Sequence, residues 1–231
     1  MKLTRADREA IKMGNFSYIL NKGAELYKKE DFKDAIEYYR MASAMGSDVA
    51  NSNLGYCYLY GRDIEVNVDL AISYFELAAN RGNIDAINKL GDIYSSDKYV
   101  AKDDELSIYY YQLAANLIVG FDWTQDDVIA FADELQQYPN LCFALARELM
   151  PGGSLKTSLE QAYQFLSQAE KGYMLEIMNG AQFYMNAHRS VLGLLNDSIF
   201  DDVRDEYDYL FDDDEDDDLL YDAFDGDEQM F

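Results

Sequence analysis

The sequence is poor in the residues that interrupt helices, cross-link chains or bind metals. Its 231 residues include two prolines, two cysteines, one histidine and one tryptophan. So little proline leaves long segments free to form helix. Cys57 and Cys142 lie in apolar periodic segments without C-x-x-C spacing, which favours buried free thiols over a disulfide framework or a zinc site. We therefore expect no metal ligands and no cofactor.

Basic residues are also scarce. Lysine and arginine number 19 against 44 acidic residues, which gives a net charge of −25. Binding to nucleic acid is disfavoured, because phosphate contacts need clustered cations. Charges interrupt residues 2–9 before any apolar signal segment forms, and no run of about 18 apolar residues is present to span a membrane. We expect a cytoplasmic protein that does not bind membranes.

Catalytic signatures are missing as well. His188 is the only histidine, and no cysteine or aspartate motif surrounds it. The sequence contains no G-x-S-x-G, phosphate-binding G-x-x-x-x-G-K-[ST] or H-E-x-x-H pattern. Acidic residues are abundant, but abundance alone does not establish the paired geometry of general acid–base catalysis. We predict no catalytic residues and a protein that is not an enzyme.

The sequence instead repeats itself with a period of 36 residues. The clearest pair of segments is Leu54-Gly55-Tyr56-Cys57-Tyr58 and Leu90-Gly91-Asp92-Ile93-Tyr94, followed by Tyr74-Phe75 and Ala78-Ala79 in one copy and Tyr110-Tyr111 and Ala114-Ala115 in the next. An earlier copy carries Ala35, Tyr38-Tyr39, Ala42 and Gly46 at corresponding positions. A fourth, degenerate copy carries Leu145-Ala146, Ala162, Phe165 and Ala169.

Each copy has two apolar stretches at helical spacing, separated by a turn. Gly46 and Gly82 follow the second stretch, where a left-handed helix cap favours glycine. Small residues would let the two helices cross closely, and they occur at Gly55, Gly91 and Ala146. Nineteen extra residues separate the third and fourth copies, and their Thr124-x-x-Asp127 start resembles a capping box. We interpret them as an inserted helix.

A single hairpin cannot bury its apolar face alone, so stacked copies predict an all-α fold. The predicted architecture is an α–α superhelix, or solenoid, with a disordered acidic C-terminal tail. The expected divisions are an N-terminal capping half-repeat (1–16), three repeats (17–120), the inserted helix (121–139), a fourth repeat (140–173), a C-terminal capping helix (174–196) and the acidic tail (197–231).

The pattern L-G-x-x-Y-x-x-G-x-x-V/I-x-x-D-x-x-x-A-x-x-Y-F-x-x-A-A-x-x-G resembles the Sel-one-like repeat, a relative of the tetratricopeptide repeat. The copy that begins at Leu54 matches almost throughout, whereas the first copy is more similar to a plain tetratricopeptide unit. Proteins of this family are α-solenoids that act as adaptors and scaffolds. The resemblance implies a non-enzymatic protein that binds another protein or a peptide, and it leaves the oligomeric state open.

The resemblance also implies which residues face a partner. Non-consensus positions of the first helix in each unit would line the concave face, and these are Tyr27, Ser52, Tyr56, Asn88 and Asp92. Tyr27 and Tyr56 are the best candidate anchors, because aromatic residues dominate interface hot spots. A solvated helix face is the alternative interpretation. The positions that grip a carboxylate in tetratricopeptide grooves hold Leu20, Asn21, Ala24, Asn53, Tyr56 and Lys89. That set departs from the pattern, so we expect no carboxylate clamp, and a groove lined with aspartate and tyrosine suits a neutral or basic peptide better.

The predicted tail combines acids with aromatic residues. Residues 197–231 contain 17 acidic residues and one arginine, including an unbroken acidic run over 212–218. Like charges repel, so we expect disorder in isolation. The aromatic residues that could dock are Tyr207, Tyr209, Phe211, Tyr221 and Phe224. The tail could solubilise the protein, dock on a basic partner or cover the protein's own groove. An alternative function is therefore an acidic inhibitor that sequesters a basic partner.

Overall fold

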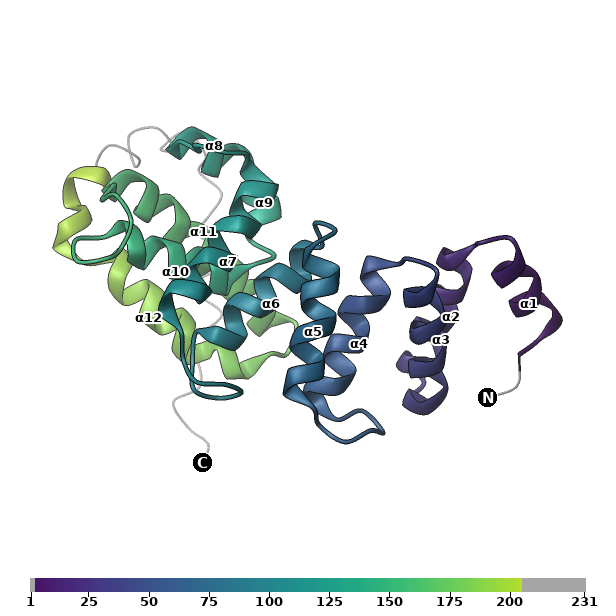
Figure 1. Cartoon of the computed structure of the whole chain (residues 1–231). Helices are drawn as coiled ribbons and strands as arrows, with labels where there is room; N and C mark the ends of the chain where they lie inside the picture. Colours follow the sequence, from purple (N-terminus) through teal and green to yellow (C-terminus); the bar gives the residue numbers. More distant parts are fainter. Residues whose placement is uncertain (1–2, 205–231) are drawn as a thin grey trace, which may run out of the picture.

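The chain forms a row of antiparallel helical hairpins that stack in sequence order (Figure 1). The computed structural model describes residues 3–204, which contain helices and turns but no β-strand. The hairpins are α2 (Phe16–Lys28) with α3 (Phe32–Ala44), α4 (Asp48–Tyr60) with α5 (Val68–Ala79), α6 (Ile84–Tyr94) with α7 (Asp104–Val119), and α10 (Pro139–Leu149) with α11 (Leu159–Met178). The predicted all-α solenoid is confirmed over these residues.

Short polar residues begin the helices, and glycines end several of them. Ser47 Oγ accepts a hydrogen bond from the backbone N–H of Ala50 at 3.1 Å, which satisfies one of the free amides at the start of α4. Gly46 and Gly82 follow α3 and α5 with φ of 99° and 79°. This is the left-handed conformation predicted for both, and a side chain at either position would strain it.

The short helix α1 (Arg5–Lys12) covers the N-terminal end of the row. Its Asp7 side chain is fully buried and accepts a hydrogen bond from Tyr38 Oη at 2.9 Å. Burial raises the pKa of Asp7, but hydrogen bonds from Thr4, Tyr38 and Tyr18 outweigh burial and lower the pKa below its usual value. The ionised carboxylate therefore fastens α1 to α3.

A glycine in the first helix of three hairpins lets an aromatic ring of the second helix touch its backbone. A Cβ atom added to Gly55 would lie 2.6 Å from Cε1 of Phe75, too close for any real contact. The same contact joins Gly23 to Tyr39 and Gly91 to Tyr111. In the fourth hairpin, Ala146 and Leu166 stand at the corresponding 20-residue spacing, and both are fully buried. The fourth hairpin therefore carries an extra methyl group on its first helix and a smaller side chain at the matching position of its second helix.

The 19-residue insertion forms two short helices instead of the predicted single one. They are α8 (Gln125–Ala130) and α9 (Ala132–Leu135), and Phe131 breaks the helix between them with φ −108° and ψ 28°. Thr124 caps α8 with the predicted capping box. Both helices pack against α11, while α10 packs directly against α7. The insertion is therefore accommodated beside the row, and the stacking of hairpins continues across it.

The C-terminal boundaries also differ from the prediction. Helix α11 continues to Met178, and the short helix η1 (Gln182–Tyr184), α12 (Met185–Leu195) and η2 (Ser198–Phe200) follow it. The tail was predicted to begin at residue 197, but Phe200 is fully buried and Val203 is 6% exposed. The Phe200 ring lies 5.7 Å from the ring of Tyr163 in α11. Residues 197–203 thus belong to the packed structure, because these apolar side chains complete its core.

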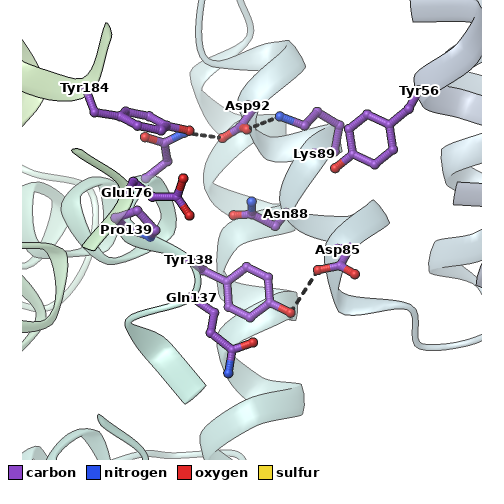
Figure 2. A pocket seen from close by; sticks show the side chains of 11 residues that line it. Tyr56, Asp85, Asn88, Lys89, Asp92, Gln137, Tyr138, Pro139, Glu176 and Tyr184 are labelled. Atoms are coloured by element: carbon purple, nitrogen blue, oxygen red, sulfur yellow. Dashed lines mark hydrogen bonds and ion pairs between the residues drawn. The ribbon is translucent and has the colours of Figure 1, made fainter. Parts of the chain in front are cut away.

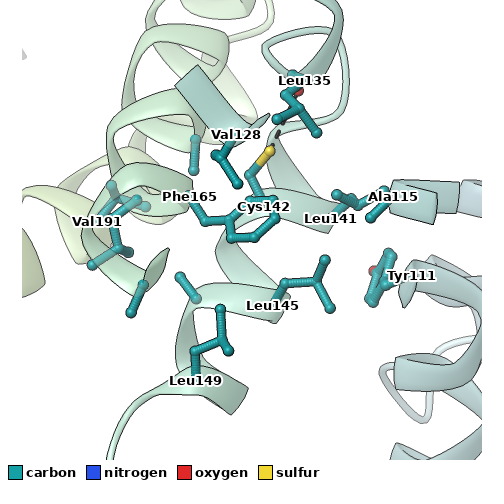
Figure 3. Close-up of a cluster of buried hydrophobic side chains, with 14 of the residues drawn as sticks. Tyr111, Ala115, Val128, Leu135, Leu141, Cys142, Leu145, Leu149, Phe165 and Val191 are labelled. Atoms are coloured by element: carbon teal, nitrogen blue, oxygen red, sulfur yellow. Dashed lines mark hydrogen bonds between the residues drawn. The ribbon is translucent and has the colours of Figure 1, made fainter. Parts of the chain in front are cut away.

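The largest buried cluster lies at the C-terminal end, where α7, α10, α11 and α12 converge on the insertion (Figure 3). Cys142 is fully buried in it and donates a hydrogen bond to the Leu135 carbonyl, with Sγ and O 3.4 Å apart. In the second hairpin, Tyr58 and Tyr74 are half-buried and stack on each other at 5.6 Å. Phe75 and Leu54 are fully buried and occupy the interior of that hairpin.

We expect Gly55→Ala to destabilise the fold. Overpacking a close helix crossing costs about 1–3 kcal/mol, because the Phe75 ring must leave its position. Gly193→Ala is the matched control, since Gly193 is also helical but has no atom within 4 Å of an added Cβ. That change should stabilise the protein by up to about 1 kcal/mol. Urea denaturation followed by circular dichroism measures both.

The same measurement tests the compensation observed in the fourth hairpin. Phe75→Leu combined with Gly55→Ala reproduces the pairing of Ala146 with Leu166, so the double variant should be more stable than the sum of the single changes indicates. Additive effects would show that the glycine and the ring do not share one contact.

A chain that ends at residue 196 should be less stable than one that ends at residue 204. The shorter chain loses the buried Phe200 side chain, and removal of a core phenylalanine costs about 3–5 kcal/mol. Thermal unfolding of the two truncated chains measures the difference. Equal melting temperatures would show that residues 197–204 do not contribute to the core.

Candidate functional site

A pocket of about 190 Å³ lies where the first helices of the second, third and fourth hairpins meet the C-terminal helices (Figure 2). Its walls come from α4, α6, the start of α10, the end of α11 and η1. The lining residues are Tyr56, Asp85, Asn88, Lys89, Asp92, Gln137, Tyr138, Pro139, Asn140, Glu176 and Tyr184. We call this the α6–α10 pocket.

Three of the five predicted partner-binding residues come together in this pocket: Tyr56, Asn88 and Asp92. The other two do not. Tyr27 packs against the ring of Phe32 at 5.0 Å, within the first hairpin. Ser52 is only 4% exposed, contrary to its predicted place on a binding face. Helix α4 is covered by α3 on one side and α5 on the other, so a non-consensus position on it need not reach the surface.

Asp92 connects three helices beneath the pocket. Its carboxylate accepts hydrogen bonds from Lys89 Nζ at 2.6 Å, from Tyr111 Oη at 2.9 Å and from Asn140 Nδ2 at 3.2 Å. Tyr173 Oη in turn donates to Asn140 Oδ1 at 2.6 Å. The carboxylate therefore joins α6 to α7 and to α10. Its main role is structural, and it also forms part of the pocket wall.

Lys89 is fixed by the same carboxylate. Burial lowers the pKa of Lys89, but the charge and hydrogen bond of Asp92 outweigh burial and raise the pKa above its usual value. The ammonium also lies 5.8 Å from the centre of the Tyr56 ring. Lys89 is therefore charged and already has its counterion inside the protein.

The Tyr56 ring forms one wall of the pocket. It meets the Phe75 ring edge-on at 5.1 Å and stacks on the Tyr60 ring at 6.1 Å. Burial raises the pKa of Tyr56 to about 12, so its hydroxyl is neutral at physiological pH. The Phe75 and Tyr60 rings thus fix the position of the Tyr56 ring, which lines the pocket.

Two acceptors remain available in the pocket. The buried Asn88 Oδ1 accepts no hydrogen bond from residues 3–204. Asp85, at the exposed rim, accepts a single side-chain hydrogen bond within residues 3–204, from Tyr138 Oη at 3.0 Å, which leaves its second carboxylate oxygen available. Buried polar atoms are usually hydrogen-bonded, so Asn88 marks a position suited to a donor from a ligand.

A wider groove of about 820 Å³ continues from the pocket along α6 and α10. It shares Lys89, Asp92, Asn140 and Tyr184 with the pocket. The groove is lined by the basic residues Lys98, Lys102 and Arg147 and by the acidic residues Asp104 and Glu148. Arg147 lies over the Phe143 ring, and Lys98 lies over the Tyr99 ring. The α6–α10 pocket is therefore predominantly acidic, whereas the groove carries charges of both signs.

Sequence reasoning did not identify the wall built by Gln137–Asn140, Glu176 and Tyr184. Gln137, Tyr138 and Pro139 lie in the predicted insertion, and Glu176 and Tyr184 follow the fourth repeat. Asn140 is the first residue of the fourth repeat, and it was not among the positions assigned to a groove. The five predicted tail-docking residues, Tyr207, Tyr209, Phe211, Tyr221 and Phe224, lie outside the described residues. The prediction for them stays a prediction.

The described residues present no reactive arrangement in this cleft. His188 lies elsewhere, with Nε2 2.9 Å from Glu170 Oε1, and so joins α12 to α11. Cys57 and Cys142 are buried, and burial raises the pKa of the Cys57 thiol to about 11, which keeps it protonated. Over residues 3–204, no group of three or more potential metal-binding side chains occurs. In the same range, no helix has the length and apolarity needed to cross a bilayer.

Tandem helical hairpins with a shared core and a cleft along their first helices define an α-solenoid repeat protein. The family model "Sel1 repeat" matches residues 10–47, 48–83, 84–118 and 139–172. The chain belongs to the Sel1 repeat family. The first unit, which resembles a plain tetratricopeptide unit in sequence, is matched as a Sel1 repeat as well. Proteins with these repeats generally mediate protein–protein interactions and are typically not catalytic.

Two solved structures are similar to the chain. The crystal structure of a Sel1 repeat protein from Oxalobacter formigenes shares 18% sequence identity and a TM-score of 0.52, over 70% of this chain and 59% of that one. A protective antigen of uropathogenic Escherichia coli with an SLR fold shares 20% identity and a TM-score of 0.45, over 75% of this chain and 44% of that one. The chain thus spans about half the length of these proteins. No curated protein matches it.

We expect Asp92→Ala to destabilise the protein more than Asp85→Ala. Loss of hydrogen bonds to a charged group costs about 1.5–3 kcal/mol, because Lys89, Tyr111 and Asn140 all lose their shared acceptor. Asp85 loses one bond at the exposed rim, worth about 0.5–1.5 kcal/mol. Urea denaturation compares the two. A larger loss for Asp85→Ala would contradict the structural role of Asp92.

Proposed function

We propose that the chain is a non-enzymatic scaffold that binds a partner protein or peptide in the cleft between α4, α6 and α10. The observation that supports the proposal most strongly is the α6–α10 pocket itself. It brings three of the predicted partner-binding residues together around a buried acceptor that has no donor within residues 3–204. Membership of the Sel1 repeat family supports protein binding as the general class of function, and the cleft supports the proposed location of the binding site.

The shape of the cleft suits an extended segment. The pocket and the groove share four lining residues, so a peptide can occupy both without a break. The rings of Tyr56, Tyr138 and Tyr184 are all half-buried in the pocket, and tyrosine is among the residues that dominate binding energy in interfaces. A partner of neutral or basic character fits the α6–α10 pocket, whose lining contains more carboxylates than cations.

Blocking the cleft without changing its charge tests the proposal. Gln137→Trp places a large ring at the pocket, and Ser96→Trp does so in the groove, since both residues are exposed and line the cleft. Ser73→Trp, on the exposed side of α5, is the matched control. The three variants and the wild type are used to capture proteins from the native lysate, and the captured proteins are quantified by mass spectrometry.

We expect both cleft variants to reduce capture of a shared partner by about tenfold or more, the effect of 1.4 kcal/mol, while the Ser73→Trp variant retains it. A partner captured equally by all four proteins would contradict binding in the cleft.

The same assay distinguishes the alternative in which the acidic C-terminal segment sequesters a basic partner. A chain that ends at residue 204 keeps Phe200 and Val203 and lacks the 212–218 acidic run. If the partner is lost with this truncation and at high salt, but survives Gln137→Trp, the acidic segment carries the binding.

A further inference from the structure

We propose that the α6–α10 pocket recognises an arginine side chain of the partner. This inference rests on the proposed function, because it names the group that enters the cleft. The pocket, at about 190 Å³, is smaller than the roughly 300–1,000 Å³ of sites that enclose whole small molecules. It has room for the end of one side chain, and the rest of the peptide continues into the adjoining groove.

The charge of the lining calls for a cation. Asp85, Asp92 and Glu176 contribute three carboxylates, and Lys89 contributes the only cation among the lining residues. Because Lys89 is already paired with Asp92 at 2.6 Å, the two rim carboxylates of Asp85 and Glu176 remain without a cationic partner in residues 3–204. A positive group that enters between them restores the balance.

The hydrogen-bonding pattern calls for a donor-rich group. Asn88 Oδ1 lies buried in the pocket with no donor from the described chain, and Figure 2 shows Asn88 between the Asp92 and Asp85 sides of the wall. Asp85 accepts one hydrogen bond from Tyr138, and the Glu176 carboxylate offers further acceptor oxygens. Arginine carries five N–H donors and no acceptor, so it can serve several of these oxygens at once.

The aromatic walls favour arginine over lysine. Tyr56, Tyr138 and Tyr184 line the pocket on α4, the start of α10 and η1. A planar guanidinium stacks on such rings and is more weakly hydrated than an ammonium, which keeps a strong hydration shell. The segment 205–231 of the chain itself is a poor occupant here, because it contains 14 acidic residues and no base.

The probe for this inference is Nα-acetyl-arginine amide, added to the full-length ¹⁵N-labelled protein and followed by NMR. Nα-acetyl-citrulline amide is the matched neutral probe, and Nα-acetyl-lysine amide tests the shape of the cation. The pocket variant carries Asp85→Asn and Glu176→Gln. The control variant carries Asp69→Asn and Glu65→Gln, two exposed acids outside the cleft, so both variants have the same net charge.

We expect millimolar binding of the arginine probe, with signals of Asn88 and its neighbours shifting, and binding of citrulline weaker by about tenfold or more. The pocket variant should lose at least about fivefold in affinity for the arginine probe, and the control variant should stay within about twofold. Lysine should bind more weakly than arginine.

Four results would overturn the inference: no arginine binding, equal binding of citrulline, tighter binding of lysine, or equal weakening in the pocket and control variants. Equal weakening would indicate non-specific attraction to an acidic protein. None of these results affects the proposed function, because the tryptophan variants test occupation of the cleft without altering any charge. Loss of capture in those variants without arginine binding would leave the scaffold intact and the arginine assignment wrong.

Discussion

The contact of an aromatic ring on one helix with a glycine backbone on the other, present in three of the four hairpins, is the contact on which the structure depends. At Gly55 the ring of Phe75 occupies the volume that a side chain would fill, and Gly91 and Tyr111 repeat the arrangement. Because the ring lies against the backbone, it fixes both the distance and the rotation of the paired helices. The direction of the neighbouring side chains, among them Asp92 next to Gly91, follows from that rotation.

The repeat pattern was sufficient to predict most of the fold, because its information is local. Left-handed glycines such as Gly46 and the small residue at Gly55 each act within one hairpin, and both lie where their spacing indicates. The division of 121–139 into two helices and the packing of Phe200 were not predictable in the same way. Both depend on contacts with α11, which no period in the sequence encodes.

Only one wall of the candidate site could be predicted from the sequence, for the same physical reason. Tyr56, Asn88 and Asp92 occupy non-consensus positions of the first helix in two successive repeats, so their common face could be anticipated. The opposite wall is built by residues far away in sequence, as the bond between Asp85 and Tyr138 shows with its separation of 53 residues. Ser52 shows that a position outside the consensus can still be buried by neighbouring helices.

The placement of the pocket between α6 and α10 links its shape to the bending of the whole row. These helices belong to different repeats, and few groups span the space between them: Asp92 with Asn140, and Asp85 with Tyr138. A partner that contacts both walls, as proposed here, binds best at the helix spacing that keeps both walls within reach. Its binding would favour that spacing, and any movement of α6 away from α10 would weaken the binding.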